Sequence, residues 1–144
     1  MRAMSSAESP TVRALLVEAA LPVDDLDEAE VRFLVALRDG EVVGAIGLQP
    51  FGRAGLLRSL VVRPDARGHG TGARLVDGLE RHAHAHGITA LVLLTQTAEA
   101  FLAAHGYRAI ARGDAPAAVL ESAEFRALCP ASATCMEKQL EPPR

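Results

Sequence analysis

The feature that most constrains this chain is a glycine-rich turn between an apolar run and a stretch with helical spacing. The run is Leu60-Val61-Val62, and the glycine-rich turn is Arg67-Gly68-His69-Gly70-Thr71-Gly72. Glycines at alternate positions allow successive backbone N–H groups to point into one concavity, at the positive end of the following helix. Such a site attracts an anion, and the planar guanidinium of Arg67 suits phosphate oxygens. The stretch therefore predicts a pyrophosphate-binding turn.

Two other kinds of phosphate-binding turn fit this stretch less well. The P-loop of nucleotide triphosphatases requires Lys after its last glycine, whereas Ala73 follows Gly72 and the chain contains no Gly-Lys-Ser/Thr. The dinucleotide fingerprint fits loosely as Gly68-x-Gly70-x-x-Ala73. It also requires an acidic residue about twenty positions later, and residues 88–94 contain none. The spacing therefore favours a different pyrophosphate-containing ligand.

The rest of the chain shows the helical and strand-like patterns of one domain. Asp39-Gly40 between two apolar runs is typical of a hairpin turn, because both residues tolerate positive φ. Gly87 suits the C-terminal cap of a helix that starts in the glycine-rich turn. The sequence leaves undecided whether a strand precedes residue 11. Residues 114–116 can start a helix. We expect strands at 31–37, 41–48, 56–62, 88–94, 107–111 and 133–140, and helices at 11–20, 70–86, 98–105 and 122–128.

These motifs resemble those of the GNAT N-acetyltransferases, whose coenzyme A turn reads Gln/Arg-x-x-Gly-x-Gly/Ala after a strand. The glycine-rich turn matches every fixed position, with Leu60-x-Val62-x-Pro64 before it and Leu75-Val76 in the helix after it. The resemblance implies an α+β GNAT fold, with a mixed, mostly antiparallel central sheet and helices on both faces. Residues 1–144 would form a single GNAT domain, in which two central strands splay apart to hold acetyl-CoA.

The resemblance also implies how acetyl-CoA is held and used. The pantetheine arm would pair with the exposed strand edge, and a backbone N–H near Val62 would polarise the acetyl carbonyl as in an oxyanion hole. An acceptor amine would then attack directly, without an acyl-enzyme. The expected acetyl-CoA-binding residues are Leu60, Val61, Val62, Arg67, Gly68, His69, Gly70, Thr71 and Gly72.

The sequence departs from the family where acids and bases are expected. Many members carry a tyrosine that protonates the departing thiolate, but Leu102 stands at that position and Tyr107 follows Gly106 instead. The usual asparagine at the start of that helix is Thr95, for which we expect a catalytic or acceptor-binding role. A general base is left open between Glu41, a histidine and a chain of water molecules.

Arg58 and Ser59 replace carboxylates that the family often places before the turn, and they are candidate acceptor-binding residues. An arginine near the acetyl group suits an acceptor with a carboxylate, phosphinate or arsonate. The alternative is a solvated charge on the face of a strand.

Three runs, at 57–62, 93–99 and 125–136, resemble the arsenic-resistance-associated ArsN-type branch of the family. This resemblance implies a small amine acceptor of the class of anionic amino acids and their arsenic- or phosphinate-containing analogues. One alternative is an acetyl-CoA-binding regulatory module in which Cys129 and Cys135 hold arsenite, although we favour two buried free thiols. A second is a peptide or protein N-acetyltransferase, which a lid formed by residues 113–130 would disfavour.

Composition narrows the expected partners to small molecules. The net charge of −3, the single tyrosine and the absence of a basic run argue against nucleic-acid binding. No apolar run has transmembrane length and the polar start lacks a signal-peptide core, so we expect a cytoplasmic protein without a membrane partner. His82, His84 and His86 could share a metal, but a solvated helix end is favoured and no metal is expected. Many family members form homodimers, and the sequence defines no interface.

Overall fold

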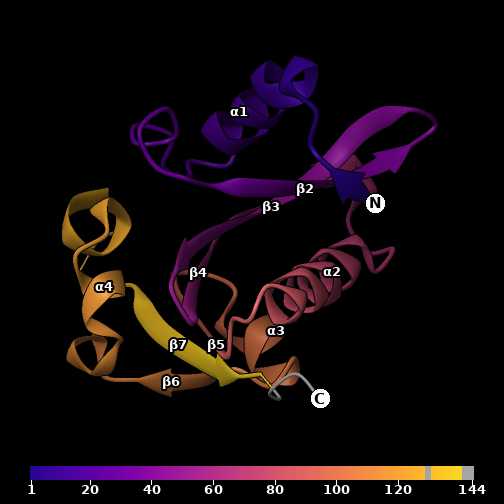
Figure 1. Ribbon diagram of the computed structural model, residues 1–144. Coiled ribbons are helices and arrows are strands. Elements are labelled where there is room, and N and C mark those ends of the chain that lie inside the picture. Colours follow the sequence, from indigo (N-terminus) through magenta and orange to yellow (C-terminus); the bar gives the residue numbers. More distant parts are fainter. Residues whose placement is uncertain (129–130, 141–144) are drawn as a thin grey trace.

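The computed structural model describes residues 1–128 and 131–140, which form a seven-stranded sheet with helices on both faces (Figure 1). The strands are β1 (Arg2–Ala3), β2 (Arg32–Arg38), β3 (Glu41–Phe51), β4 (Ala54–Val62), β5 (Ala90–Thr95), β6 (Arg108–Ile110) and β7 (Thr134–Gln139). They lie in the order β1-β2-β3-β4-β5-β7-β6. Within the described residues β4 and β5 make the one parallel pairing. The predicted mixed, mostly antiparallel GNAT sheet is confirmed.

In the part of the chain that the structure describes, four α-helices and several short turns complete the fold. The helices are α1 (Ser9–Glu18), α2 (Thr71–Ala85), α3 (Glu99–Ala104) and α4 (Ala117–Leu120). The 3₁₀ turns are Ser6–Glu8, Pro64–Ala66 and Arg112–Asp114, and a π-helical turn spans Glu124–Leu128. The strand left open near the N-terminus is present as β1, which pairs with β2. Within the described residues, no helix is long and apolar enough to span a membrane.

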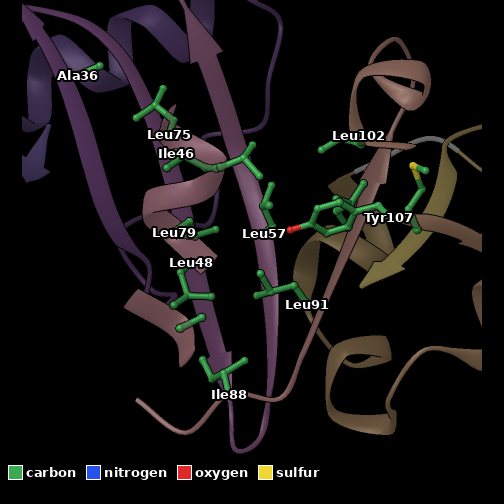
Figure 2. Close-up of a cluster of buried hydrophobic side chains, with 14 of the residues drawn as sticks. Ala36, Ile46, Leu48, Leu57, Leu75, Leu79, Ile88, Leu91, Leu102 and Tyr107 are labelled. Carbon is green, nitrogen blue, oxygen red and sulfur yellow. The ribbon is translucent and has the colours of Figure 1, made fainter. Parts of the chain in front are cut away.

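The two faces of the sheet are covered by different helices. On one face α2 buries Leu75 and, one helical turn later, Leu79 against strand residues such as Ile46 (Figure 2). Val76 of the same helix is buried in this cluster as well. On the other face α1 buries Val12, Leu15 and Leu16 against Val35, Ala45 and Val61. Because neighbouring residues of a strand point to opposite faces, Ala45 and Ile46 of β3 belong to these two separate cores.

Of the segment predicted as a lid, the structure describes residues 113–128, which pack on the sheet. Its Ala115, Val119 and Phe125 pack with Leu56 of β4 and Val92 of β5 in a third apolar cluster. In Figure 1 this segment lies beside β7, at the end of the sheet opposite β1. It nevertheless reaches the functional region, because its π-helical turn lines a cavity there.

The two central strands separate halfway along their length. β4 pairs with β5 through Ala54, Gly55 and Leu56 alone, whereas β5 continues beside β7 to its last residue. Gly55 leaves room for the neighbouring strands at this point, since an added Cβ would lie 2.7 Å from Leu48 Cδ1 of β3 and 3.0 Å from Leu91 Cδ2 of β5, and these side chains would have to shift. Residues 57–62 of β4 therefore keep β3 on one side and face a gap on the other, as the family resemblance predicts.

A β-bulge bends β4 at the start of this gap. Arg58 pairs with Gly47 and Val61 with Ala45, so Ser59 and Leu60 together face the single residue Ile46. Ser59 has a φ of 59°, which costs a non-glycine residue about 1–2 kcal/mol. Bulges redirect the side chains beside them, and this one lies where two cavities meet.

Candidate active site

Two adjoining cavities occupy the gap between β4 and β5. The turn cavity, of about 670 Å³, is lined by the end of β4, the glycine-rich turn and the start of α3. The sheet cavity, of about 480 Å³, is lined by residues 57–60, residues 93–98 and Glu124. They share five lining residues, so a bound molecule could extend from one cavity into the other: Ala19, Leu21, Leu60, Thr97 and Ala98.

The glycine-rich turn has the geometry predicted for a pyrophosphate site. Gly68 and Gly70 have φ values of 84° and 75°, which L side chains rarely adopt. A Cβ on Gly68 would meet no protein atom within 4 Å, so it would project into open space beside the backbone. α2 starts directly afterwards at Thr71, and the N–H groups of a first helical turn have no intrahelical acceptor. Left-handed glycines and a helix start are features of an anion site, and the pyrophosphate site itself stays a prediction.

Arg67 and His69 take different positions in the turn. Arg67 lines the turn cavity, and its Nε donates to the Val62 carbonyl at 3.0 Å, which holds the side chain across the end of β4. His69 lines a separate small cavity, and its carbonyl accepts a hydrogen bond from Arg74 Nη1 at 3.0 Å. Of the predicted acetyl-CoA residues, all except His69 line the turn cavity.

The backbone of Val62 faces the gap. The N–H of Arg63 donates to the Val43 carbonyl of β3 at 2.7 Å, so it points toward the sheet. Successive N–H groups of a strand alternate in direction, so the Val62 N–H points the other way, toward the cavities. This is the orientation that an oxyanion-hole donor at Val62 requires.

Thr95 lies at the opposite wall, where β5 ends. Its Oγ1 accepts a hydrogen bond from the Ala98 N–H at 3.0 Å, just before α3 begins. The bond uses the hydroxyl oxygen as an acceptor, so its hydrogen can donate to a molecule in the sheet cavity.

Arg58 forms a buried ion pair that neither interpretation of the sequence anticipates. Its Nη1 and Nη2 donate to the Oδ2 and Oδ1 atoms of Asp25 at 2.6 and 2.7 Å. Gln49 Oε1 lies 3.2 Å from Nη1, and Ser59 Oγ lies 3.4 Å from Nε. The Arg58 side chain is 0% exposed, which corrects the alternative of a solvated strand-face charge. The Arg58 hydrogen bonds hold the pKa of Asp25 below its usual value.

Glu124 is a lining residue that sequence reasoning missed. The π-helical turn brings it into the wall of the sheet cavity, where its Oε1 lies 3.7 Å from Arg58 Nε. Burial raises the pKa of this carboxyl to about 7, the Arg58 charge opposes the rise, and the Asp25 charge adds to it. Glu41, the carboxylate considered as a base, is instead exposed and pairs with Arg63 at 3.3 Å, outside both cavities.

Leu102, at the position of the family's tyrosine acid, and Tyr107, the tyrosine of this chain, are both buried. Leu102 lines the sheet cavity with an apolar side chain. The Tyr107 hydroxyl donates to Glu80 Oε2 at 2.9 Å, and Lys138 Nζ donates to Glu80 Oε1 at 2.9 Å. Burial, reinforced by the Glu80 charge, raises the pKa of Tyr107 far above its usual value. Tyr107 therefore stays protonated and links α2 to the residue before β6, while Lys138 links α2 to β7.

The candidate histidines and cysteines do not form a metal-binding cluster within the described residues. The rings of His82 and His86 lie 4.3 Å apart, and burial lowers the pKa of His82. Within residues 1–128 and 131–140, no group of three or more His, Cys, Asp and Glu side chains could hold a metal ion. Cys135 is buried in the third apolar cluster, where burial raises its thiol pKa. Cys129 lies outside the described residues.

Comparisons with known proteins show the family to which this chain is similar. A curated relative, the IAA acetyltransferase of Azospirillum brasilense, is 42% identical over 77 residues, which are 52% of this chain and 50% of the relative. A Mycobacterium tuberculosis structure in complex with CoA is 27% identical, with a TM-score of 0.82 over 97% of this chain and 98% of its own.

The Neisseria gonorrhoeae N-acetylglutamate synthase, solved with coenzyme A and N-acetyl-glutamate, has the same fold at 21% identity and a TM-score of 0.81. The match covers 98% of this chain and 34% of the synthase. The chain therefore spans about a third of the synthase, and it matches half the length of the curated relative. Residues 3–107 also match the sequence profile of the acetyltransferase (GNAT) family. The chain therefore belongs to the acetyltransferase (GNAT) family.

Proposed function

We propose that this protein transfers the acetyl group of acetyl-CoA to the primary amine of a small acceptor. The observation that carries the proposal is the β4 edge, which loses its partner after Leu56 and ends at the Val62 N–H beside the glycine-rich turn. One molecule can then place its pyrophosphate at the turn and its thioester where the two cavities meet.

Each wall of the site has a part in this reaction. The N–H groups of the turn and Arg67 would hold the pyrophosphate, and residues 60–62 would pair with the pantetheine arm. When bound, acetyl-CoA supplies the activated acetyl group. The Val62 N–H would donate to the acetyl oxygen as negative charge develops there, and Thr95 would orient the acceptor.

The narrower acceptor class that we propose is an anionic amino acid or analogue, including arsenic- or phosphinate-containing ones as in the ArsN-type branch. Arg58 supports it as a buried cation in the wall of the sheet cavity. Because Asp25 holds both terminal nitrogens of Arg58, the Ser59 and Thr95 hydroxyls are the better placed direct contacts for an anion.

Thiol release from acetyl-CoA tests this function against L-glutamate, phosphinothricin, an arsenic-containing glutamate analogue, spermidine and a lysine-containing peptide. Saturable release with a small amine supports the transferase, and a preference for the acidic compounds supports the narrower class. Release with the peptide alone favours the peptide acceptor. Acetyl-CoA binding without release from any amine would contradict the proposal.

A further inference from the structure

One acidic side chain that lines the sheet cavity, Glu124, has no role in the proposed function. Within the described part of the chain, Glu124 is the one carboxylate or histidine that lines either cavity. It lines the sheet cavity together with Leu60 and Ala98, which also line the turn cavity. An acceptor amine in the sheet cavity would therefore share that cavity with the Glu124 carboxyl.

The charges around Glu124 come from two other elements. Arg58 of β4 lies 3.7 Å from its Oε1, and Asp25 belongs to the loop between α1 and β2. The short hydrogen bonds of the Arg58 terminal nitrogens go to Asp25, while Nε is the atom nearest Glu124. The carboxyl groups of Asp25 and Glu124 thus share the one guanidinium of Arg58. When both carboxyls are ionised, their negative charge exceeds the positive charge of Arg58, so this cluster can accept a cation.

Burial and the Asp25 charge make the ionised form of Glu124 unfavourable, and its pKa rises to about 7. A group that titrates near neutral pH is well suited to take up and release protons at that pH. A primary alkylamine, with a pKa of roughly 10 like that of lysine, arrives as an ammonium ion and cannot attack until it loses a proton.

From this arrangement we infer that Glu124 is the general base of the sheet cavity, which binds the acceptor ammonium and removes a proton from it. The inference rests on the proposed function and deepens it. It assigns the base that the sequence left open, and it requires an acceptor that enters as a cation at its amino group.

The proton balance is as follows. The Glu124 carboxylate takes one proton from the ammonium and later passes it to bulk water. The neutral nitrogen forms the C–N bond with the acetyl carbon, and the C–S bond breaks with its electron pair going to sulfur. The second proton lost by the nitrogen goes to that sulfur, so the products are an N-acetyl amine, a free thiol and one released proton.

The experiment compares wild type with Glu124→Gln, which keeps the size of the side chain and removes its charge. Glu121→Gln is the matched control, because Glu121 lies three residues earlier with its side chain 78% exposed. Thiol release is measured from pH 5.5 to 10 with whichever of L-glutamate and spermidine turns over faster in wild type. Acetyl-CoA binding is measured for each variant by calorimetry, and the Glu124 carboxyl is titrated by isotope-edited infrared spectroscopy without substrates.

We expect Glu124→Gln to lower kcat about 100-fold at pH 7, with acetyl-CoA affinity unchanged. The wild-type rate should rise through pH 7, and the deficit of the variant should shrink at high pH as the amine loses its proton unaided. Glu121→Gln should behave as wild type. A carboxyl band that titrates near pH 7 and is absent from Glu124→Gln supports the assignment independently of turnover.

Two results would overturn the inference in different ways. If wild type turns over and Glu124→Gln, with intact acetyl-CoA binding, keeps both kcat and the pH profile, Glu124 is not the base and the proposed function stands. If wild type binds acetyl-CoA and releases no thiol with either amine or with the wider panel, the proposed function fails and this inference fails with it.

Discussion

Arg58 and Asp25, thirty-three positions apart in the chain, form a two-point ion pair with N–O distances of 2.6 and 2.7 Å. Both side chains are buried, and Arg58 belongs to the strand that carries the bulge. The pair therefore joins the loop after α1 to β4 at the cavity. Residues 19–22, which precede Asp25 in this loop, line the sheet cavity as well.

Asp25→Asn should destabilise the protein strongly, because it removes the charge of the carboxylate that holds both terminal nitrogens of the buried Arg58 guanidinium. Breaking a buried pair in this way costs about 3–5 kcal/mol, and we expect that loss in the free energy of unfolding measured with urea. Asp24→Asn is the control, since Asp24 is the exposed neighbour in the same loop. Equal stability of the two variants would show that the pair contributes nothing net.

Gly68→Ala should weaken acetyl-CoA binding tenfold or more while leaving the KM of the amine unchanged. The added methyl meets no protein atom, but it enters the concavity proposed for the pyrophosphate. Gly87→Ala is a matched control: Gly87 also has a positive φ, of 80°, with open space around its Cβ, and lies outside both cavities. Both variants should lose a similar stability of about 1–2 kcal/mol. If the two variants bind acetyl-CoA with similar affinity, the glycine-rich turn is not part of the binding site.

The glycine-rich turn and α2 were predictable because their signals are local. Alternate glycines, the strand before them and the apolar spacing after them all lie within about thirty residues. The predicted hairpin at Asp39-Gly40 is confirmed for the same reason, with φ values of 53° and 81°. Element ends differ by a few residues, as at the strand expected over 88–94 and found at Ala90–Thr95.

The carboxyl partners of Arg58 were not predictable, because only the folded chain brings them together. Asp25 lies in the acidic run 24–30, where nothing in the sequence separates it from its exposed neighbours. Glu124 and the exposed Glu121 lie three residues apart in a stretch with helical spacing. The sequence alone does not tell which of the two carboxyls is buried in the fold. The positive φ of Ser59 was equally hidden, since it follows from a bulge rather than from a glycine.

Tyr107→Phe should leave kcat within twofold of wild type, because the hydroxyl hydrogen-bonds to Glu80 rather than facing either cavity. We expect a stability loss of about 1–2 kcal/mol, since Glu80 loses one donor and keeps the Lys138 ammonium. Steady-state kinetics and urea unfolding check the two parts. A large loss of kcat in a well-folded variant would instead give Tyr107 a chemical role.

Thr95→Val should raise the KM of the acceptor several-fold more than that of acetyl-CoA, because the hydroxyl hydrogen is directed at the sheet cavity in the proposed role. It should also lower stability by about 1 kcal/mol through loss of the hydrogen bond from the Ala98 N–H. Thr95→Ser keeps the oxygen and should restore both quantities. A loss of stability with unchanged KM values would limit Thr95 to holding the turn before α3.

The stability of the protein should depend on pH through Glu124. Folding raises the pKa of this carboxyl from 4.5 to about 7, so the folded chain holds the proton more tightly than the unfolded chain. The free energy of unfolding therefore falls as pH rises from about 4.5 to about 7, and the loss is complete above that range. Glu124→Gln does not titrate, so urea unfolding should show it gaining stability relative to wild type over the same range. Glu121→Gln should show no such gain, and a wild type that becomes more stable than Glu124→Gln as pH rises would show that the ionised carboxylate is favoured in the fold.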